Sequence, residues 1–426
     1  MAKVTLYIKN ASIILISMIG ICFILSVIPN FIPERNIKDN LIKSINTIVS
    51  DDSKQPFCNL LFFKLDNFTD ALILNIAYNV KSDTPVKSAM ENKYYINNDF
   101  DIIITTKNIF HNDYTDATPI NYTRYWHGNQ LFLRPLLLIM DYTGIRIINY
   151  ICLSIIFIYL CFLLIKKGEK NICLSIFTSA ILLNLWIVPL SMQFSATIYI
   201  SLLASIIILL IVKKRTEIQI NIILFFIIIG GSTSYFDLLT TPLITLGLPL
   251  IIYSSLLNMN IKNKMHIIII CSLSWVLGYS VIWISKWCIA HFIIGYEFED
   301  AIESIVFRTS TEYDNFDMSF KGIFNFMINH AHTALYAAII LALVFIIFNF
   351  ILYYKKKRAF IDNSYLLLIA SMPFFWCIVL RNHSIIHCSF VWRVFFISMV
   401  AYVLFIANIY KSKYNNENSC SYTMLQ

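Results

Sequence analysis

The apolar segments of this chain alternate with polar ones in a pattern typical of an integral membrane protein. One apolar stretch at about 11–30 precedes a hydrophilic block over roughly 32–146, and further apolar stretches then continue to about residue 410. Runs of about 17–25 apolar residues can cross a bilayer as helices. We therefore predict an all-α polytopic membrane protein with about ten transmembrane helices. They are expected near 11–30, 147–165, 171–190, 195–212, 218–236, 242–258, 266–291, 333–354, 364–380 and 392–410.

The same pattern predicts how the chain is divided. The parts are a first transmembrane helix at 1–31, a large loop domain at 32–146, a bundle at 147–410 with a second loop at 296–332, and a tail at 411–426. Within the loop domain, 36–49 and 70–79 are predicted as short helices. Residues 131–141 are predicted to lie along the membrane surface.

Basic residues gather in alternate loops, and this predicts the orientation in the membrane. The clusters are Lys166, Lys167 and Lys170; Lys213, Lys214 and Arg215; Lys262 and Lys264; Lys355, Lys356, Lys357 and Arg358; and Lys411 with Lys413. Because Lys and Arg favour cytoplasmic loops, both termini are predicted to be cytoplasmic in a multi-pass protein of the cell membrane. The 32–146 block, the 233–241 turn, the 296–332 loop and the 381–391 turn would then face outward.

Composition narrows the class of partner. Hydrophobic residues make up 58% of the chain, which is more than a water-soluble fold can bury, so a lipid bilayer is expected around it. The net charge of +8 comes mostly from the loop clusters, so no nucleic acid is expected. Most of the 10 cysteines lie inside apolar segments, and neither CxxC nor a zinc-ligand spacing occurs. No disulfide framework or structural zinc site is indicated.

Two carboxylates in the segment LDNFTDALILNIAYN are candidates for acid–base chemistry. Asp66 and Asp70 are four residues apart and would share one face of a helix. Partial desolvation beside a membrane raises a carboxyl pKa and suits it to act as a general base. The alternative is structural, with Asp66 capping the helix and Asp70 complementing its dipole.

Cationic residues occur in two of the segments predicted to face outward. In YTRYWHGNQLFLRP (122–135), Arg124, His127 and Arg134 stand among aromatic residues, and the alternative there is an interfacial anchor. In LRNHSIIHCSFVWR (380–393), the candidates are Arg381, His383, His387 and Arg393. Arginine binds phosphate oxygens bidentately, so an anionic phosphate is favoured there. The two histidines could instead share a metal ion, although no third ligand is evident.

Two single residues complete the set of candidates. Asp237 is the charged residue of the turn SYFDLLTTP, where it could bind a sugar hydroxyl or simply stabilise the turn. Lys286 lies in WISKW near the outer end of a predicted span, where it is either functional or extends to the interface.

This arrangement resembles the GT-C superfamily of membrane glycosyltransferases. DNFTD (66–70) lies in the first outer loop, where those families place a catalytic acid, although it is further from the first span than is usual. YTRYWHG, YFDLLTTP and RNHSIIH are similar to membrane proteins of Gram-positive surface-polysaccharide loci.

The resemblance implies transfer of a sugar from a polyprenyl-phosphate-linked donor to a glycan or lipid-linked acceptor of the cell envelope. Asp66 or Asp70 would be the base. Arg124, His127, Asp237, Lys286, Arg381, His383, His387 and Arg393 would bind the substrates. The resemblance implies no particular cofactor with certainty, and it leaves a divalent cation as an open alternative.

Two other functions share parts of the pattern. A polysaccharide polymerase or ligase also has many spans and outer arginines, but its large loop normally comes late in the chain. A flippase or transporter needs a polar path through the bundle. The segments near 171–190, 195–212 and 333–354 contain no Asp, Glu, Lys or Arg, which argues against such a path.

Overall fold

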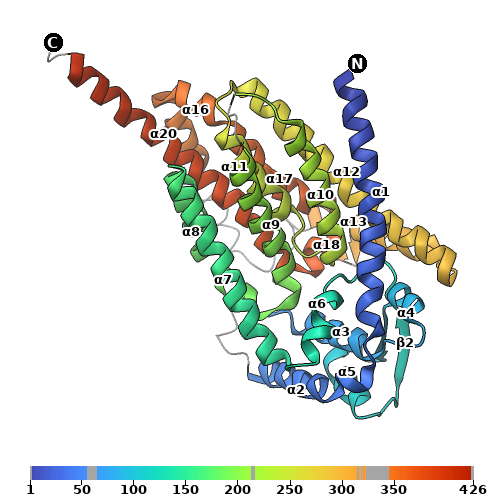
Figure 1. The fold of residues 1–426 in the computed structure, drawn as a ribbon. Coiled ribbons are helices and arrows are strands. Elements are labelled where there is room, and N and C mark those ends of the chain that lie inside the picture. Colours follow the sequence, from blue (N-terminus) through green and yellow to red (C-terminus); the bar gives the residue numbers. More distant parts are fainter. Residues whose placement is uncertain are drawn as a thin grey trace.

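The computed structural model describes two parts, a block of short elements and a bundle of long helices beside it (Figure 1). The residues it describes are 2–54, 65–212, 216–313, 316–317, 319, 321–322 and 345–423. The predicted all-α class is confirmed in these residues, apart from two small antiparallel pairs of strands.

The block corresponds to the hydrophilic segment after the first helix. Its elements are η1 (Ile28–Phe31), η2 (Glu34–Asn36), α2 (Lys38–Lys54), α3 (Asn67–Tyr78), α4 (Pro85–Glu91), β1 (Lys93–Asn97), α5 (Ile102–Phe110), β2 (Ala117–Asn121) and α6 (Gln130–Leu137). The short helices expected at 36–49 and 70–79 appear as α2 and α3. Strands β1 and β2 pair in a register that sets Lys93 opposite Asn121, and the sequence analysis did not predict this pairing.

Helix α2 forms because its apolar residues recur every three or four positions. Leu41, Ile45 and Ile48 are fully buried, as is Ile37 just before the helix. They belong to one apolar cluster with the buried residues of α3 and α5. An amphipathic helix of this kind gains most of its stability from burying that face. The block is therefore a folded domain with its own core.

The bundle contains the remaining helices. Its elements are α1 (Ala2–Val27), α7 (Tyr142–Lys166), α8 (Lys170–Leu182), η4 (Leu185–Leu190), α9 (Met192–Ile211), α10 (Ile220–Phe236), α11 (Leu243–Leu256), α12 (Ile261–Ile294), α13 (Phe298–Thr309), β3 (Glu312–Tyr313), β4 (Phe316–Asp317), a helix at Phe345–Lys355, α16 (Lys357–Asn363), α17 (Tyr365–Val379), α18 (Arg381–Ile386), α19 (Cys388–Val391), η5 (Trp392–Phe395) and α20 (Phe396–Thr423).

The helices of this bundle identify a multi-pass membrane protein, but the expected ten spans are not confirmed. In the described residues, 5 helices are long and apolar enough to cross a membrane, or 6 if α16 and α17, bent by 52°, form one span. The segment expected to span at 171–190 is broken. Asn184 takes a left-handed conformation there, and Pro189 follows within η4. Helices α10 and α11 are shorter than the lengths expected, and 333–344 lie outside the described residues.

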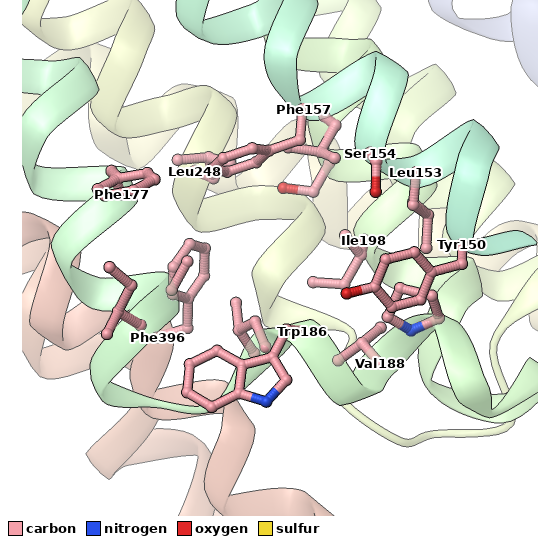
Figure 2. Close-up of a pocket in the computed structure, with 16 residues that line it drawn as sticks. Tyr150, Leu153, Ser154, Phe157, Phe177, Trp186, Val188, Ile198, Leu248 and Phe396 are labelled. Carbon is pink, nitrogen blue, oxygen red and sulfur yellow. The ribbon is translucent and has the colours of Figure 1, made fainter.

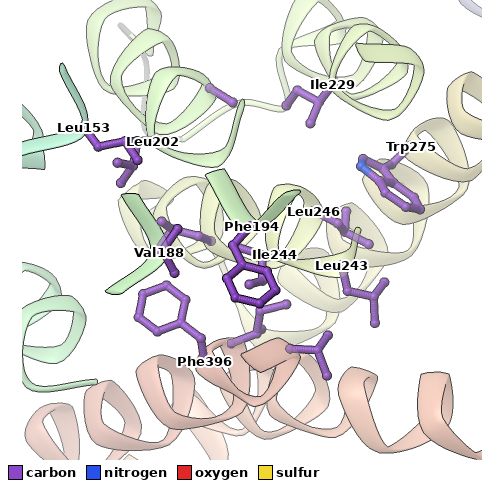
Figure 3. Close-up of a cluster of buried hydrophobic side chains, with 14 of the residues drawn as sticks. Leu153, Val188, Phe194, Leu202, Ile229, Leu243, Ile244, Leu246, Trp275 and Phe396 are labelled. Atoms are coloured by element: carbon purple, nitrogen blue, oxygen red, sulfur yellow. The ribbon is translucent and has the colours of Figure 1, made fainter. Parts of the chain in front are cut away.

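Close helix contacts hold the bundle together. A Cβ atom added to Gly230 of α10 would clash with the Trp275 carbonyl, and one added to Gly278 of α12 would clash with the Ile227 carbonyl. Small residues at such crossings let two backbones approach closely. Buried side chains of α7, η4, α9, α10, α11, α12 and α20 fill the space between the helices (Figure 3).

Polar contacts hold the block of short elements together and attach it to the bundle, and the block is called the outer domain below, after its predicted side of the membrane. Arg134, fully buried on α6, donates to the carbonyl of Pro29 at 3.0 Å and also to those of Ile32 and Ala77. The Trp126 indole donates to the carbonyl of Ile282 in α12 at 2.8 Å. The amide of Gly128 donates to the carbonyl of Tyr235 in α10 at 3.0 Å. The YTRYWHG segment is therefore a docking segment, which fixes the domain over the bundle.

The opposite end of the bundle carries both termini (Figure 1). Asn171 at the start of α8 donates to Asn408 of α20, which donates to Asn363 of α16. Lys264 of α12 lies 4.3 Å from the centre of the Tyr365 ring. Segments next to several basic clusters thus meet at one end. The cytoplasmic location of that end stays a prediction.

Candidate functional site

Asp66 lies at the junction of the outer domain and the bundle, where it caps α3. Its Oδ1 accepts from the Thr69 amide at 3.0 Å, which is the structural role considered as an alternative. Its Oδ2 is buried and has no hydrogen-bond partner among the residues that the structure describes. Burial raises the pKa of the Asp66 carboxyl, partly offset by the Thr69 hydrogen bonds and by the charge of Arg393. Oδ1 of Asp66 therefore has a structural role, whereas Oδ2 is left without a partner among the described residues.

Asp70, one turn further along α3, is fully enclosed. Its Oδ2 accepts from the Tyr142 hydroxyl at the start of α7. Its Oδ1 accepts from the Gln193 amide at 3.1 Å, in the first turn of α9. Burial raises the pKa of Asp70 to about 6, opposed by the Tyr142 hydrogen bond. Asp70 therefore joins the outer domain to two bundle helices, and both of its oxygens are occupied.

Arg393 brings positive charge to Asp66 from the far end of the sequence. Its side chain is buried, with the guanidinium carbon 4.1 Å from the centre of the Phe194 ring and 4.8 Å from that of Trp392. The two residues are close enough for the Arg393 charge to act on the Asp66 carboxyl. The DNFTD segment and the last outer turn are thus brought together.

An apolar pocket of about 260 Å³ opens deeper in the bundle, between α7, α8, η4 and α9 (Figure 2). Its lining residues are Tyr150, Leu153, Ser154, Phe157, Phe177, Ala180, Ile181, Leu185, Trp186, Val188, Pro189, Ile198, Ser201, Leu202, Leu248 and Phe396. Tyr150, Phe177 and Trp186 are 42%, 51% and 48% exposed, so the pocket opens on the outer surface of the bundle.

The pocket begins close to the Asp66 cluster. Phe396 lines it one turn after Arg393, and Tyr150 lies eight residues after Tyr142, or about 12 Å along an α-helix. Nearby, Asn149 joins α7 to η4 and α9, because its amide donates to the Pro189 carbonyl of η4 and to the Ser195 hydroxyl of α9, both at 2.7 Å. The polar cluster therefore lies on the side of the apolar pocket that is nearest the outer domain.

A second cluster forms around Arg308 of α13, which was not among the predicted site residues. Arg308 donates to the Tyr125 hydroxyl and lies 5.6 Å from the centre of that ring. Its charge also acts on His383 and His387, whose ring centres are 4.7 Å apart. The available signal was its position as a basic residue in the second long outer loop.

Burial favours the neutral form of the histidines of this region, whereas the sequence analysis predicted a cationic role for them. Burial lowers the pKa of His127 and of His383 to about 3, and that of His387 to about 4. Nearby Arg and Lys charges lower these values further. The desolvation of a protonated ring explains the result. A neutral ring can accept a hydrogen bond but carries no charge that would balance a phosphate.

Several other predicted site residues have structural contacts. Lys286 is fully buried, and its ammonium donates to the carbonyls of Ala89 at 2.7 Å and Met90 at 3.2 Å. Asp237 is buried in its own turn, where it accepts from the Thr240 amide and hydroxyl. Burial raises the pKa of Asp237 to about 7.

Two other arginines of the predicted set belong to different parts of the fold. Arg124 forms an ion pair with Asp300 of α13, with 3.0 Å between the charged atoms. Arg381 begins α18, on the turn that also carries His383.

The structure therefore assembles part of the predicted set. Asp66, Asp70 and Arg393 form one cluster, and His127, His383 and His387 lie around Arg308 and Tyr125. Among the residues that the structure describes, no group of three or more His, Cys, Asp or Glu could hold a metal ion. Comparison of the chain with protein-family models, with curated proteins and with solved structures finds no match.

Proposed function

We propose that this protein transfers a sugar from a polyprenyl-phosphate-linked donor to a cell-envelope glycan on the outer face of the membrane. One arrangement carries the proposal: an oxygen of Asp66 without a hydrogen-bond partner among the described residues is within electrostatic range of Arg393, on the side of the apolar pocket nearest the outer domain. A base, a cation and an apolar site for a lipid chain are the elements that such a reaction needs.

Asp66 is the proposed general base. As an acceptor hydroxyl attacks the anomeric carbon, its proton passes to Oδ2 of Asp66, while Oδ1 keeps the helix cap. The carboxyl pKa is raised by burial, which brings its proton affinity nearer to that needed at neutral pH. Asp70 is the less suitable base, because its two oxygens already accept hydrogen bonds and its side chain is fully buried.

Arg393 is proposed to stabilise the leaving group. When the bond between the anomeric carbon and the phosphate oxygen breaks, the electron pair stays on the phosphate. A positioned guanidinium stabilises that developing charge, and burial strengthens the interaction. The histidines are assigned no role in this step, because burial favours their neutral form.

The pocket is proposed to hold the part of the polyprenyl chain nearest the phosphate. Its volume of about 260 Å³ is slightly below the range of about 300–1,000 Å³ typical of small-molecule sites. It could therefore enclose only part of a long chain, and the rest would lie in the bilayer beside Phe177 and Trp186.

Photo-crosslinking in liposomes tests this site. A polyprenyl phosphate with a diazirine in its chain should label α7, α8 and η4. Ala180→Phe, which fills the pocket, should reduce that labelling several-fold. The control is Leu174→Phe on the same helix, because Leu174 is 57% exposed and does not line the pocket. Equal labelling of the two variants would contradict the proposal.

A further inference from the structure

Two buried histidines present a ring nitrogen without a partner. Nε2 of His127 lies 3.1 Å from the Tyr122 carbonyl oxygen, and Nε2 of His383 lies 2.9 Å from that of Leu239. A carbonyl can only accept, so each Nε2 carries the proton. Nδ1 of a neutral ring is then an acceptor. Both Nδ1 atoms are buried and have no hydrogen-bond partner in the described part of the chain. Buried acceptors of this kind are normally satisfied, so a ligand that donates hydrogen bonds is indicated.

Unusual backbone conformations hold both rings in place. His127 has φ of 54°, and Leu239, whose carbonyl binds His383, has φ of 67°. Residues other than glycine rarely adopt this left-handed region, and such strain is concentrated at functional sites. The two histidines are 2% and 3% exposed, so their orientations are fixed by packing as well.

Arg308 and Tyr125 supply groups that complement these acceptors. Arg308 donates to the Tyr125 hydroxyl, and its guanidinium has five N–H groups in all. The Tyr125 ring packs against Tyr122 at 5.5 Å and stacks on Trp283 at 6.1 Å. Donors, acceptors and aromatic rings in one place are suited to a ligand rich in hydroxyl groups.

We propose that His127, His383 and Arg308 form a carbohydrate subsite that binds the acceptor glycan. This inference rests on the proposed transferase function. Sugar hydroxyls would donate to the two Nδ1 atoms, and sugar oxygens would accept from Arg308. A phosphate or carboxylate fits less well, because an ionised oxygen has no hydrogen to donate and the Nδ1 lone pair repels it.

The location suits an acceptor. His387 stacks on Phe390 at 5.1 Å, Phe390 packs against Phe194 at 6.4 Å, and Phe194 lies under Arg393. A series of aromatic contacts therefore links His387, next to the subsite, to Arg393. A glycan held by Arg308 could extend its terminal sugar along these rings toward the proposed base.

Saturation-transfer NMR on the full chain in nanodiscs tests the subsite. The probe is the set of oligosaccharides released by mild acid from the surface glycan of the source cells. His127→Gln and His383→Gln should each weaken binding about 2- to 10-fold, the effect of losing one neutral hydrogen bond. The Gln amide can still donate to the Tyr122 or Leu239 carbonyl, so the variants should fold. Each is checked by its thermal midpoint.

A matched control and a pH series complete the experiment. His291→Gln should leave binding unchanged, because His291 is exposed and bonds to the Tyr296 carbonyl. Binding should be constant from pH 5 to 8, since the rings stay neutral. Unchanged binding in both Gln variants, stronger binding on acidification, or no binding by the wild type would each overturn the subsite. Labelling by the lipid probe is independent of these results, so failure of the subsite is distinguishable from failure of the proposed function.

Discussion

Asp66→Asn separates the base from the helix cap. Asparagine caps a helix about as well as aspartate, so the bond from the Thr69 amide is retained and stability should change by less than about 0.5 kcal/mol. The amide cannot take up the acceptor proton. Loss of a general base slows a reaction about 10²- to 10⁴-fold, or about 3–5 kcal/mol in activation free energy. Asp66→Ala should slow transfer similarly and also cost about 1 kcal/mol of stability.

Asp70→Asn is the matched comparison, one turn away on the same helix. Because both oxygens of Asp70 are engaged, the account predicts less than about a 10-fold change in rate. Its effect on stability should depend on pH. A carboxyl pKa raised from 3.8 to about 6 contributes stability that is present below 3.8 and is lost as the pH rises through 6. As the pH rises from 3.8 to 6, the free energy of unfolding of Asp70→Asn should therefore increase by about 3 kcal/mol relative to that of the wild type.

The assay is transfer in proteoliposomes at saturating lipid donor, with the thermal midpoint measured on the same preparations. The rate of the wild type should rise with pH through the raised pKa of Asp66. Full activity of Asp66→Asn, or a larger loss in Asp70→Asn than in Asp66→Asn at equal stability, would refute the assignment of the base.

Three further results are expected. Lys286→Met should lower stability by roughly 2 kcal/mol or more, because the carbonyls of Ala89 and Met90 lose their donor, while the KM for the donor stays the same. In thermal denaturation, Asp237→Asn should become more stable relative to the wild type as the pH rises from about 4 to 7. The reason is that the stability that Asp237 contributes below pH 3.8 is lost as the pH rises through its raised pKa of about 7. In a background without native cysteines, an impermeant thiol reagent should label Asp83→Cys but not Lys411→Cys in intact cells, and equal labelling would contradict the topology.

Local patterns predicted the elements of this chain better than the number of spans. The heptad-like spacing in α2 and the Asp66 cap of α3 follow from neighbouring residues, and both are present. The break at Asn184 depends on how η4 packs between α7 and α9, which hydropathy does not register. An apolar segment of span length can therefore be two short helices.

The candidate site divides in a similar way. The sequence indicated which polar residues lie in the turns predicted to face outward, and their types identified the candidates for the site. Their roles depend on burial, which a linear sequence does not display. Lys286 faces carbonyls of α4, and burial keeps His127 and His383 neutral. Arg308 was missed because only the fold brings α13 against Tyr125.

The most direct test is the composition and linkage of the cell-surface glycan in cells that lack this protein and are complemented with the wild type or Asp66→Asn. Both proteins must reach equal abundance in the membrane. The account predicts that a sugar is lost on deletion, is restored by the wild type and stays absent with Asp66→Asn. A glycan that is identical in all of these cells would contradict the proposed transferase function.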